Sequence, residues 1–396
     1  MRRPALVAAG LVFAAFNLRA SVAAVAPVLP EVQRADHLSS TGGGLLNAAP
    51  VACFGLFALA TPTLLRRFGA DRLLWLVVAG VAAGTAVRSV AGVFPLFLGT
   101  LVVGAAIGVG NVVLPGLVKR DFPERVALLT GLYAMALSGG AGLAAGLTVP
   151  LEHAGGLSWR GGLAIWAVPA VAALVLWPPG RVHREAGARP RGAWVLLRRS
   201  PVAWAVTAFM GLQSLGFYAL FAFIPTLLEG AGSSATLAGV ELSVSAVASL
   251  LAAFATPTVA GRLGRAWPPV AVAVGLNAAA LAGLALDPHG LGPVTVWMIV
   301  LGAGQGAMLS LALGFIVLRA PDPTQAANLS TMAQGIGYLV AAAGPFAVGA
   351  LHQLTGGWSV PLATLGAALA VALAAGVVAS GDRLVPAAPQ AAPAAP

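Results

Sequence analysis

The chain has 396 residues, of which 59% are hydrophobic and only 9% are charged, and its formal net charge is +10. A soluble domain carries about a quarter charged residues, so this chain has too few polar groups to cover its surface in water. Lipid must therefore surround much of it. The basic residues fall in short clusters between apolar runs, which argues against a nucleic-acid interface. A single cysteine, Cys53, excludes an internal disulfide and a cysteine metal cluster.

Twelve apolar runs, bounded by charges, Pro or Gly, approach or exceed the roughly 20 residues that a helix needs to cross a membrane. We predict helices at residues 5–29, 43–65, 73–92, 94–118, 126–150, 161–178, 201–228, 236–260, 268–286, 292–318, 325–350 and 359–379. The many Gly and Ala residues are consistent with this prediction, because small side chains let membrane helices pack closely.

The distribution of Lys and Arg predicts the orientation of these helices, because cytoplasmic loops carry an excess of both residues. With the N-terminus inside, 18 of the 22 Lys and Arg fall on the inner side, Arg34 and Arg160 fall in outer loops, and Arg19 and Arg88 lie inside spans. We therefore expect a multi-pass protein of the cytoplasmic membrane with both termini in the cytoplasm.

An internal repeat divides the chain. Residues 60–69 read ATPTLLRRFG and residues 255–264 read ATPTVAGRLG, which are identical at six of ten positions at an offset of 195. We expect an all-α integral membrane protein with twelve transmembrane helices in two pseudo-symmetric six-helix bundles. The expected parts are an N-terminal bundle (1–178), a cytoplasmic basic linker (179–200), a C-terminal bundle (201–380) and a disordered tail (381–396).

Arg19 is the main candidate for binding a solute. It lies about 15 residues into the first span, or about 21 Å from its inner end at 1.5 Å per residue, near the middle of the bilayer. A charge at that depth costs at least about 2.5–3.5 kcal/mol, so a partner must offset it. One interpretation is a structural ion pair between Arg19 and an acidic residue of another helix. Glu241 is the only acidic residue that lies well inside a predicted span. The other is recognition of an anionic or polar solute by the planar guanidinium.

Asn111 lies four residues before Pro115 in the fourth span. Proline has no backbone N–H, so the Asn111 carbonyl loses its helical donor and the helix should bend there. This feature is either a packing kink or a ligand contact.

Further neutral polar side chains lie at similar depth in both halves. Gln334 and Tyr338 are four residues apart and so share a helix face. Each of these residues could be interhelical glue, but together they predict a small, polar, positively charged cavity. The candidates besides Arg19 and Asn111 are Asn17, Tyr133, Gln213, Tyr218, Gln305, Gln334 and Tyr338.

Arg88 and Glu241 lie near the outer ends of their spans and are candidates for a proton-coupling group or a gate, or for a pair with each other. The sequence has no phosphate-binding loop of the G-x-x-x-x-G-K-[ST] type, no metal-ligand spacing and no Ser-His-Asp arrangement. We expect no enzyme activity, cofactor or metal.

Three stretches carry a family resemblance: AFNLRASVAAVAPVLPEV in the first span, GVGNVVLPGLVKRDFPERVALLTGLYAMALSGGAGLAAGL across the fourth and fifth, and GLQSLGFYALFAFIPTLL in the seventh. With the six-plus-six layout, they resemble the cyanate-permease and 2-nitroimidazole-transporter branch of the major facilitator superfamily. The loop RRFGADRLL matches the superfamily signature loosely and departs in spacing. The resemblance implies alternating access around a site between the halves.

We therefore expect a secondary transporter that works as a monomer in the lipid bilayer. Its expected solute is small and polar, and an anion is favoured over a neutral compound. The alternative is a proton-coupled exporter of a small aromatic drug-like compound, with Glu241 as the coupling group. A tight polar pocket would favour the first function, and a roomy aromatic pocket the second.

Overall fold

The computed structural model describes residues 4–177, 193–286 and 289–387, and these ranges are almost entirely helical. The helices are α1 (Pro4–Ala23), α2 (Val25–Ala35), α3 (Ser40–Phe68), α4 (Ala70–Arg88), α5 (Val93–Asp121), the short η1 (Pro123–Arg125), α6 (Val126–Ala154), α7 (Trp159–Ala164), α8 (Ala167–Leu176), α9 (Ala193–Arg198), α10 (Pro201–Gly230), α11 (Ala235–Leu263), α12 (Trp267–Leu286), α13 (Leu291–Leu318), α14 (Pro323–Thr355) and α15 (Ser359–Ser380).

Eleven of the described helical segments are long and apolar enough to cross a membrane, and the shorter apolar segment Trp159–Val175 supplies a twelfth. The predicted all-helical membrane protein is confirmed, and these segments fit the predicted twelve spans. Two spans differ in detail. The first continues to Ala35 instead of ending at residue 29, as α1 followed by α2. The sixth is divided into α7 and α8, because Pro169 has no N–H to donate to the carbonyl of Ile165.

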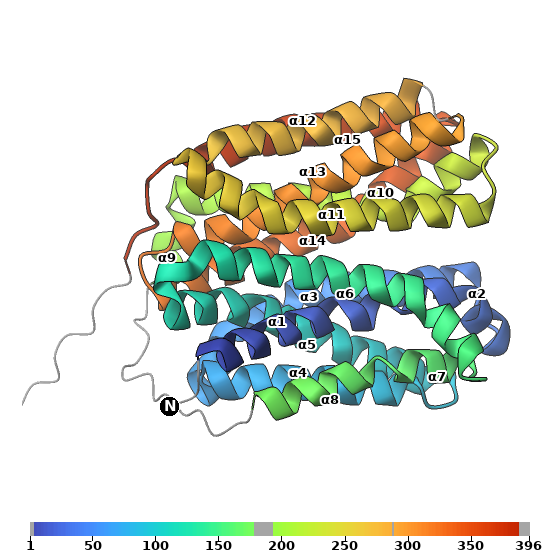
Figure 1. The fold of residues 1–396 in the computed structure, drawn as a ribbon, viewed down its shortest axis with the longest axis horizontal. Helices are drawn as coiled ribbons and strands as arrows, with labels where there is room; N and C mark the ends of the chain where they lie inside the picture. The colour runs from blue at the N-terminus through green and yellow to red at the C-terminus, as the bar shows by residue number, and fades with distance from the viewer. Residues whose placement is uncertain (1–3, 178–192, 287–288, 388–396) are drawn as a thin grey trace, which may run out of the picture.

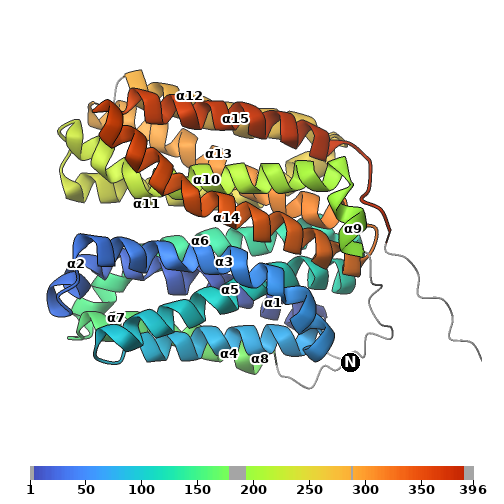
Figure 2. The same ribbon diagram turned by 180° about the vertical axis from the view of Figure 1, so that it is seen from behind.

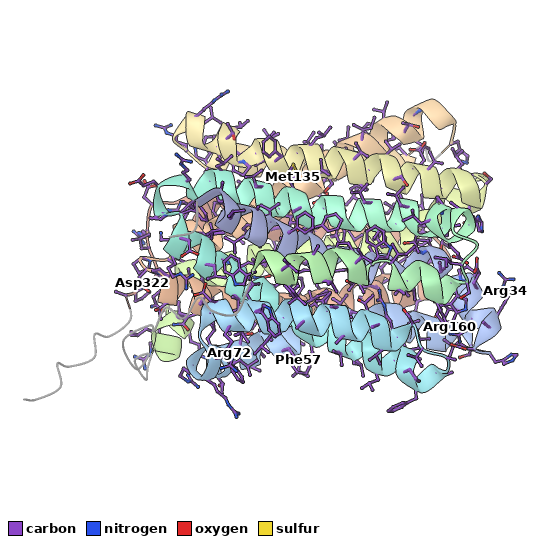
Figure 3. All side chains as sticks on the ribbon, turned by 60° about the horizontal axis from the view of Figure 1, so that its bottom comes forward. Arg34, Phe57, Arg72, Met135, Arg160 and Asp322 are labelled. Carbon is purple, nitrogen blue, oxygen red and sulfur yellow. The ribbon has the colours of Figure 1, made fainter. Side chains whose placement is uncertain are left out.

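The helices form two bodies that lie side by side, α1–α8 in one and α10–α15 in the other (Figures 1 and 2). We call the end of the molecule that carries α9 the linker end; the first described residues lie there too (Figure 1). Charged side chains mark both ends: Arg72 and Asp322 lie at the linker end, Arg34 and Arg160 at the opposite end, and Phe57 and Met135 between them (Figure 3).

Of the expected linker, residues 178–192 lie outside the described residues, and residues 193–200 contain α9, which packs on α10 and α14. Of the expected tail, residues 381–387 are described. There the backbone N–H of Val385 donates to the carbonyl of Arg319 at 2.8 Å, and Val385 is buried. The chain thus packs on the second body as far as Val385, and residues 388–396 lie outside the described residues.

The two bodies meet through α3, α5 and α6 on one side and α11, α13 and α14 on the other. Small residues permit this close approach, since a side chain at Gly55 would collide with the backbone of Gly335. At the linker end, Gly116 of α5 faces Ala327 of α14, and Gly131 of α6 faces Pro257 of α11. The bodies are therefore in contact from mid-depth to the linker end.

Candidate functional site

Arg19 lies on α1 and points across the interface into the second body. Its Nη1 donates to the hydroxyl of Tyr218 on α10, and its Nη2 donates to the hydroxyl of Tyr338 on α14 at 3.0 Å. The ring of Phe54 on α3 lies 5.6 Å from the guanidinium carbon, and the rings of Tyr218 and Tyr338 each lie 5.9 Å from it. The structure thus brings together three of the predicted site residues, one from the first body and two from the second.

No described carboxylate lies within ion-pair distance of Arg19. The ion pairs among the described residues join Arg120 to Asp71 and Asp121, and Arg160 to Asp36. The structural ion pair between Arg19 and Glu241 is not formed. Two neutral phenols and the negative faces of three aromatic rings surround the cation instead.

Asn111 joins this cluster through both its side chain and its backbone. Its Nδ2 donates to the Tyr338 hydroxyl at 3.5 Å, and its carbonyl accepts from Gln334 Nε2 at 2.6 Å and from the Ser330 hydroxyl at 3.4 Å. That carbonyl is the one that Pro115 leaves without a helical donor. The prediction of a freed oxygen is therefore confirmed, and its partners come from α14 of the other body.

Two predicted residues of the first body have no hydrogen bond to this cluster among the described residues. Asn17 donates through Nδ2 to the carbonyls of Phe13 at 2.8 Å and Pro169 at 3.1 Å, and so ties α1 to α8. Tyr133 on α6 is 2% exposed, and its hydroxyl has no hydrogen-bond partner among the described residues. Asn17 is thus an interhelical contact in this conformation, while the Tyr133 hydroxyl has no hydrogen-bond partner among the described residues.

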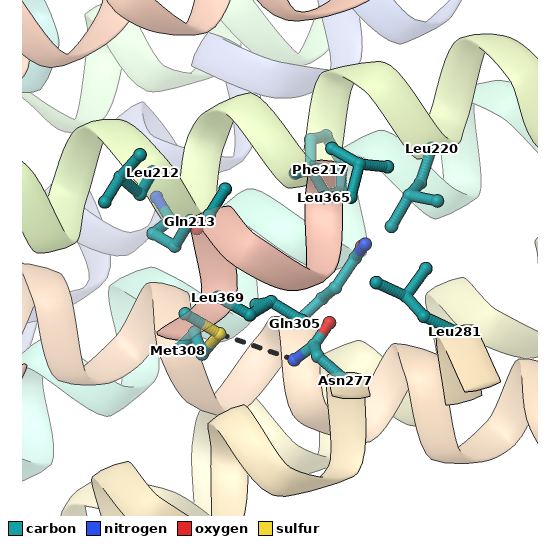
Figure 4. Close-up of a pocket in the computed structure, with 12 residues that line it drawn as sticks. Leu212, Gln213, Phe217, Leu220, Asn277, Leu281, Gln305, Met308, Leu365 and Leu369 are labelled. Atoms are coloured by element: carbon teal, nitrogen blue, oxygen red, sulfur yellow. Dashed lines mark hydrogen bonds between the residues drawn. The ribbon is translucent and has the colours of Figure 1, made fainter. Parts of the chain in front are cut away.

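Gln213 and Gln305 lie away from Arg19, in a separate pocket within the second body (Figure 4). Gln213 Nε2 donates to the Ser214 hydroxyl at 2.6 Å. Asn277 also lines this pocket and donates to the Met308 sulfur at 3.4 Å. The structure therefore divides the predicted polar set between an interface cluster and a pocket inside one body.

The two gate candidates lie in different bodies and do not pair. Glu241 of α11 is buried, and its Oε1 accepts from the hydroxyl of Thr295 on α13 at 2.5 Å. Arg88, the last residue of α4, is fully buried in the first body.

Phe54 and Ser330 belong to the site but were not predicted. A phenylalanine in an apolar run gives no signal that separates it from a core residue. Ser330 precedes Gln334 by four residues, so the two share a helix face, and Gln334 Nε2 donates to the Ser330 hydroxyl at 2.7 Å. This spacing could have indicated Ser330 as a site residue.

A cation in a polar cluster between two bundles of membrane helices is typical of a secondary transporter. The family model for the Major Facilitator Superfamily matches residues 11–345. The chain belongs to this superfamily and is a multi-pass membrane transporter; the superfamily consists of transporters and not, in general, of enzymes.

Relatives match along most of the chain. The chain is 37% identical over 367 residues to the 2-nitroimidazole transporter of Escherichia coli (strain K12), covering 89% of this chain and 90% of that one. It is 30% identical over 351 residues to the cyanate transport protein CynX of the same organism, covering 88% and 90%. It is 37% identical over 382 residues to the uncharacterized transporter YycB of Bacillus subtilis (strain 168), covering 95% and 94%.

Among solved structures, the proton:xylose symporter XylE bound to 6-bromo-6-deoxy-D-glucose superposes with a TM-score of 0.77 at 13% identity, covering 95% of this chain and 94% of that chain. At this identity the likeness bears on the fold alone. It agrees with the predicted twelve-span architecture in two six-helix bundles.

Proposed function

We propose that this transporter moves a small anionic solute and that Arg19 is the group that recognises it. The observation that carries the proposal is the Arg19 guanidinium, which lies between the two bodies and is held by the hydroxyls of Tyr218 and Tyr338 without a described carboxylate partner. Guanidinium has five N–H donors in a planar fork that suits a carboxylate or a similar oxyanion.

The hydroxyls of the two tyrosines can change their hydrogen-bond partners when a solute binds. Each hydroxyl accepts from Arg19 in this structure, yet a phenol is both donor and acceptor. An incoming anion would accept from the guanidinium in their place, and the freed hydroxyls would rotate to donate to it. Asn111 and Gln334 would complete the site through the hydrogen bonds that link them to Tyr338 and to each other.

The close packing of the cluster supports a small solute over a bulky one. Phe54 and Tyr338 are in edge-to-face contact at 5.5 Å between ring centroids, and Tyr338 touches both Arg19 and Asn111. The relatives named for cyanate and for 2-nitroimidazole indicate solutes of few atoms.

Orientation and assembly belong to the same proposal. The inner clusters of Lys and Arg, among them Arg66, Arg120 and Arg262, flank helix ends at the linker end, which we assign to the cytoplasm. The protein would then work as a monomer in the cytoplasmic membrane, and the conformation seen here would be closed toward the cytoplasm.

The test is the thermal stability of the purified protein against a panel of carboxylates, cyanate and neutral analogues. A bound ligand stabilises by about 2.7 kcal/mol at a concentration of 100 times its Kd. We expect anions to raise the melting temperature of the wild type and not of Arg19→Gln. Arg34→Gln is the matched control, because Arg34 is exposed and bonds only to the Pro30 carbonyl among the described residues. An equal response in Arg19→Gln would refute the proposal.

Export of a small aromatic compound with proton coupling at Glu241 is the second candidate. It is favoured by one observation, the burial of Glu241 with its Oε2 unpartnered among the described residues. Stabilisation by bulky neutral compounds alone, unaffected by Arg19→Gln, would place this function ahead.

A further inference from the structure

Arg88 is a buried cation of the first body, and no described residue accepts a hydrogen bond from its guanidinium. Its side chain is 0% exposed, and Nε, Nη1 and Nη2 all lack a hydrogen-bond partner among the described residues. A small cavity adjoins it, lined otherwise by Val22, Val25, Leu46, Pro50, Thr100 and Val103. Arg88 thus lines a small cavity whose other walls, apart from Thr100, are apolar.

An isolated buried charge is costly unless it is paired and hydrogen-bonded. Two buried carboxylates each have a hydrogen-bond partner: Asp71 accepts from Arg120 at 2.8 Å, and Oε1 of Glu241 accepts from the hydroxyl of Thr295. The carbonyls at the end of α4 favour a cation there, but this effect is worth only about 0.3–1 kcal/mol at typical sites and up to about 2 kcal/mol when partly buried. Water in the cavity would satisfy the donors without neutralising the charge.

The internal repeat shows how the corresponding position differs between the two bodies. The offset of 195 holds in space for α3 and α11. Pro50 of α3 faces Gly104 as Ser245 of α11 faces Gly302, and Phe54 faces Gly108 as Ser249 faces Gly306. The facing glycines of α5 and α13 correspond at an offset of 198. At the same offset Glu241 corresponds to Leu46. The second body has a carboxylate at this position, whereas the first body has a leucine beside an unpaired arginine.

We propose that the Arg88 cavity is an accessory binding site for a small monovalent anion such as chloride or nitrate, separate from the Arg19 site. One guanidinium supplies one charge, and the hydroxyl of Thr100 is already donated to the Leu96 carbonyl at 2.8 Å. The site therefore favours a weakly hydrated ion of single charge over sulfate or phosphate. The bound anion takes the place of the carboxylate that Leu46 does not provide.

The test uses the full-length Arg19→Gln protein, so that anions bound at the interface site make no contribution. Its thermal unfolding is followed against chloride and nitrate, with gluconate and sulfate at equal ionic strength as reference salts. We expect chloride and nitrate to raise the melting temperature with saturation, and the reference salts to have no such effect.

Two substitutions at Leu46 test the assignment without removing Arg88. Leu46→Glu supplies an internal carboxylate and should abolish the response to chloride and nitrate. Leu46→Gln, whose side chain has the same shape as that of Leu46→Glu but no charge, should retain the response. Arg88→Gln should also abolish it. Absence of any saturable response in the Arg19→Gln protein, or an equal response in Leu46→Glu and Leu46→Gln, would overturn the proposal. Neither result depends on which solute the interface site transports.

Discussion

The hydrogen bond from Gln334 to the carbonyl of Asn111 joins the two bodies, and its removal should shift the equilibrium between conformations. The bond is 2.6 Å long and both residues are buried. We expect Gln334→Leu to destabilise the closed linker end relative to a conformation in which the bodies separate there.

The magnitude follows from the bond and from what remains. A typical internal hydrogen bond contributes about 0.5–1.5 kcal/mol net, and leaving a buried carbonyl unsatisfied costs about 1–3 kcal/mol. In Gln334→Leu the Asn111 carbonyl keeps only the longer bond from Ser330, at 3.4 Å. A loss of about 1.5 kcal/mol corresponds to a change of about 13-fold in the ratio of conformations.

Distance distributions between spin labels report this ratio. Labels at Arg125 and Arg262, which are exposed at the linker ends of α6 and α11, would be introduced as cysteines after Cys53→Ala. Gln325→Leu is the matched control, because Gln325 lies on the same helix but donates to the Pro386 carbonyl within its own body. If Gln334→Leu and Gln325→Leu give the same distribution, the bond to Asn111 does not hold the bodies together and the reasoning fails.

Four further substitutions test other parts of the molecule. Asp71→Asn weakens a two-pronged pair with Arg120 at 2.8 and 3.0 Å. Loss of one partner of a buried pair costs about 3–5 kcal/mol; because the Arg120 side chain is 18% exposed, we expect a somewhat smaller loss, measured as a lower melting temperature. Gly306→Ala should destabilise the protein by about 1–3 kcal/mol, because the added methyl group would overlap the facing backbone of α11. Gly314→Ala adds a methyl group in open space and should stabilise the protein by up to about 1 kcal/mol. Equal effects of the two substitutions would refute the packing argument. If Glu241 couples protons to transport, Glu241→Gln should abolish uptake driven by a pH gradient in proteoliposomes and spare exchange of solute at equilibrium; loss of both activities would point to a structural role.

The spans were predictable because a membrane helix needs a minimum number of apolar residues, and each run shows that number directly. The division of the sixth span was less accessible. Its composition is as apolar as that of its neighbours, and the break at Ile165 depends on a single proline whose effect varies with the packing around it.

The sequence predicted how deep the candidate site residues lie in the membrane, but not which way their side chains point. Sequence position gives the height of a side chain in the membrane, so Gln213 and Tyr218 were both placed near the middle of α10. Which face meets the other body depends on how the helices pack, and the structure puts Tyr218 at the interface and Gln213 in an internal pocket. The free carbonyl of Asn111 followed from Pro115 alone, whereas its donors on α14 depend on the register between two bodies that no local pattern encodes.

The hydrogen bonds of Arg19 suggest how solute binding and movement of the bodies are linked. In this conformation the guanidinium on α1 holds α10 and α14 through Tyr218 and Tyr338, so these hydrogen bonds connect the two bodies. A solute that accepts from the guanidinium weakens this connection unless it also accepts from the displaced hydroxyls. An anion with oxygens on two sides would restore the bridge and let the bodies move as a loaded unit, whereas an anion with a single acceptor would bind and leave the bridge broken. On the proposed function, the first kind of anion should be transported and the second should act as an inhibitor.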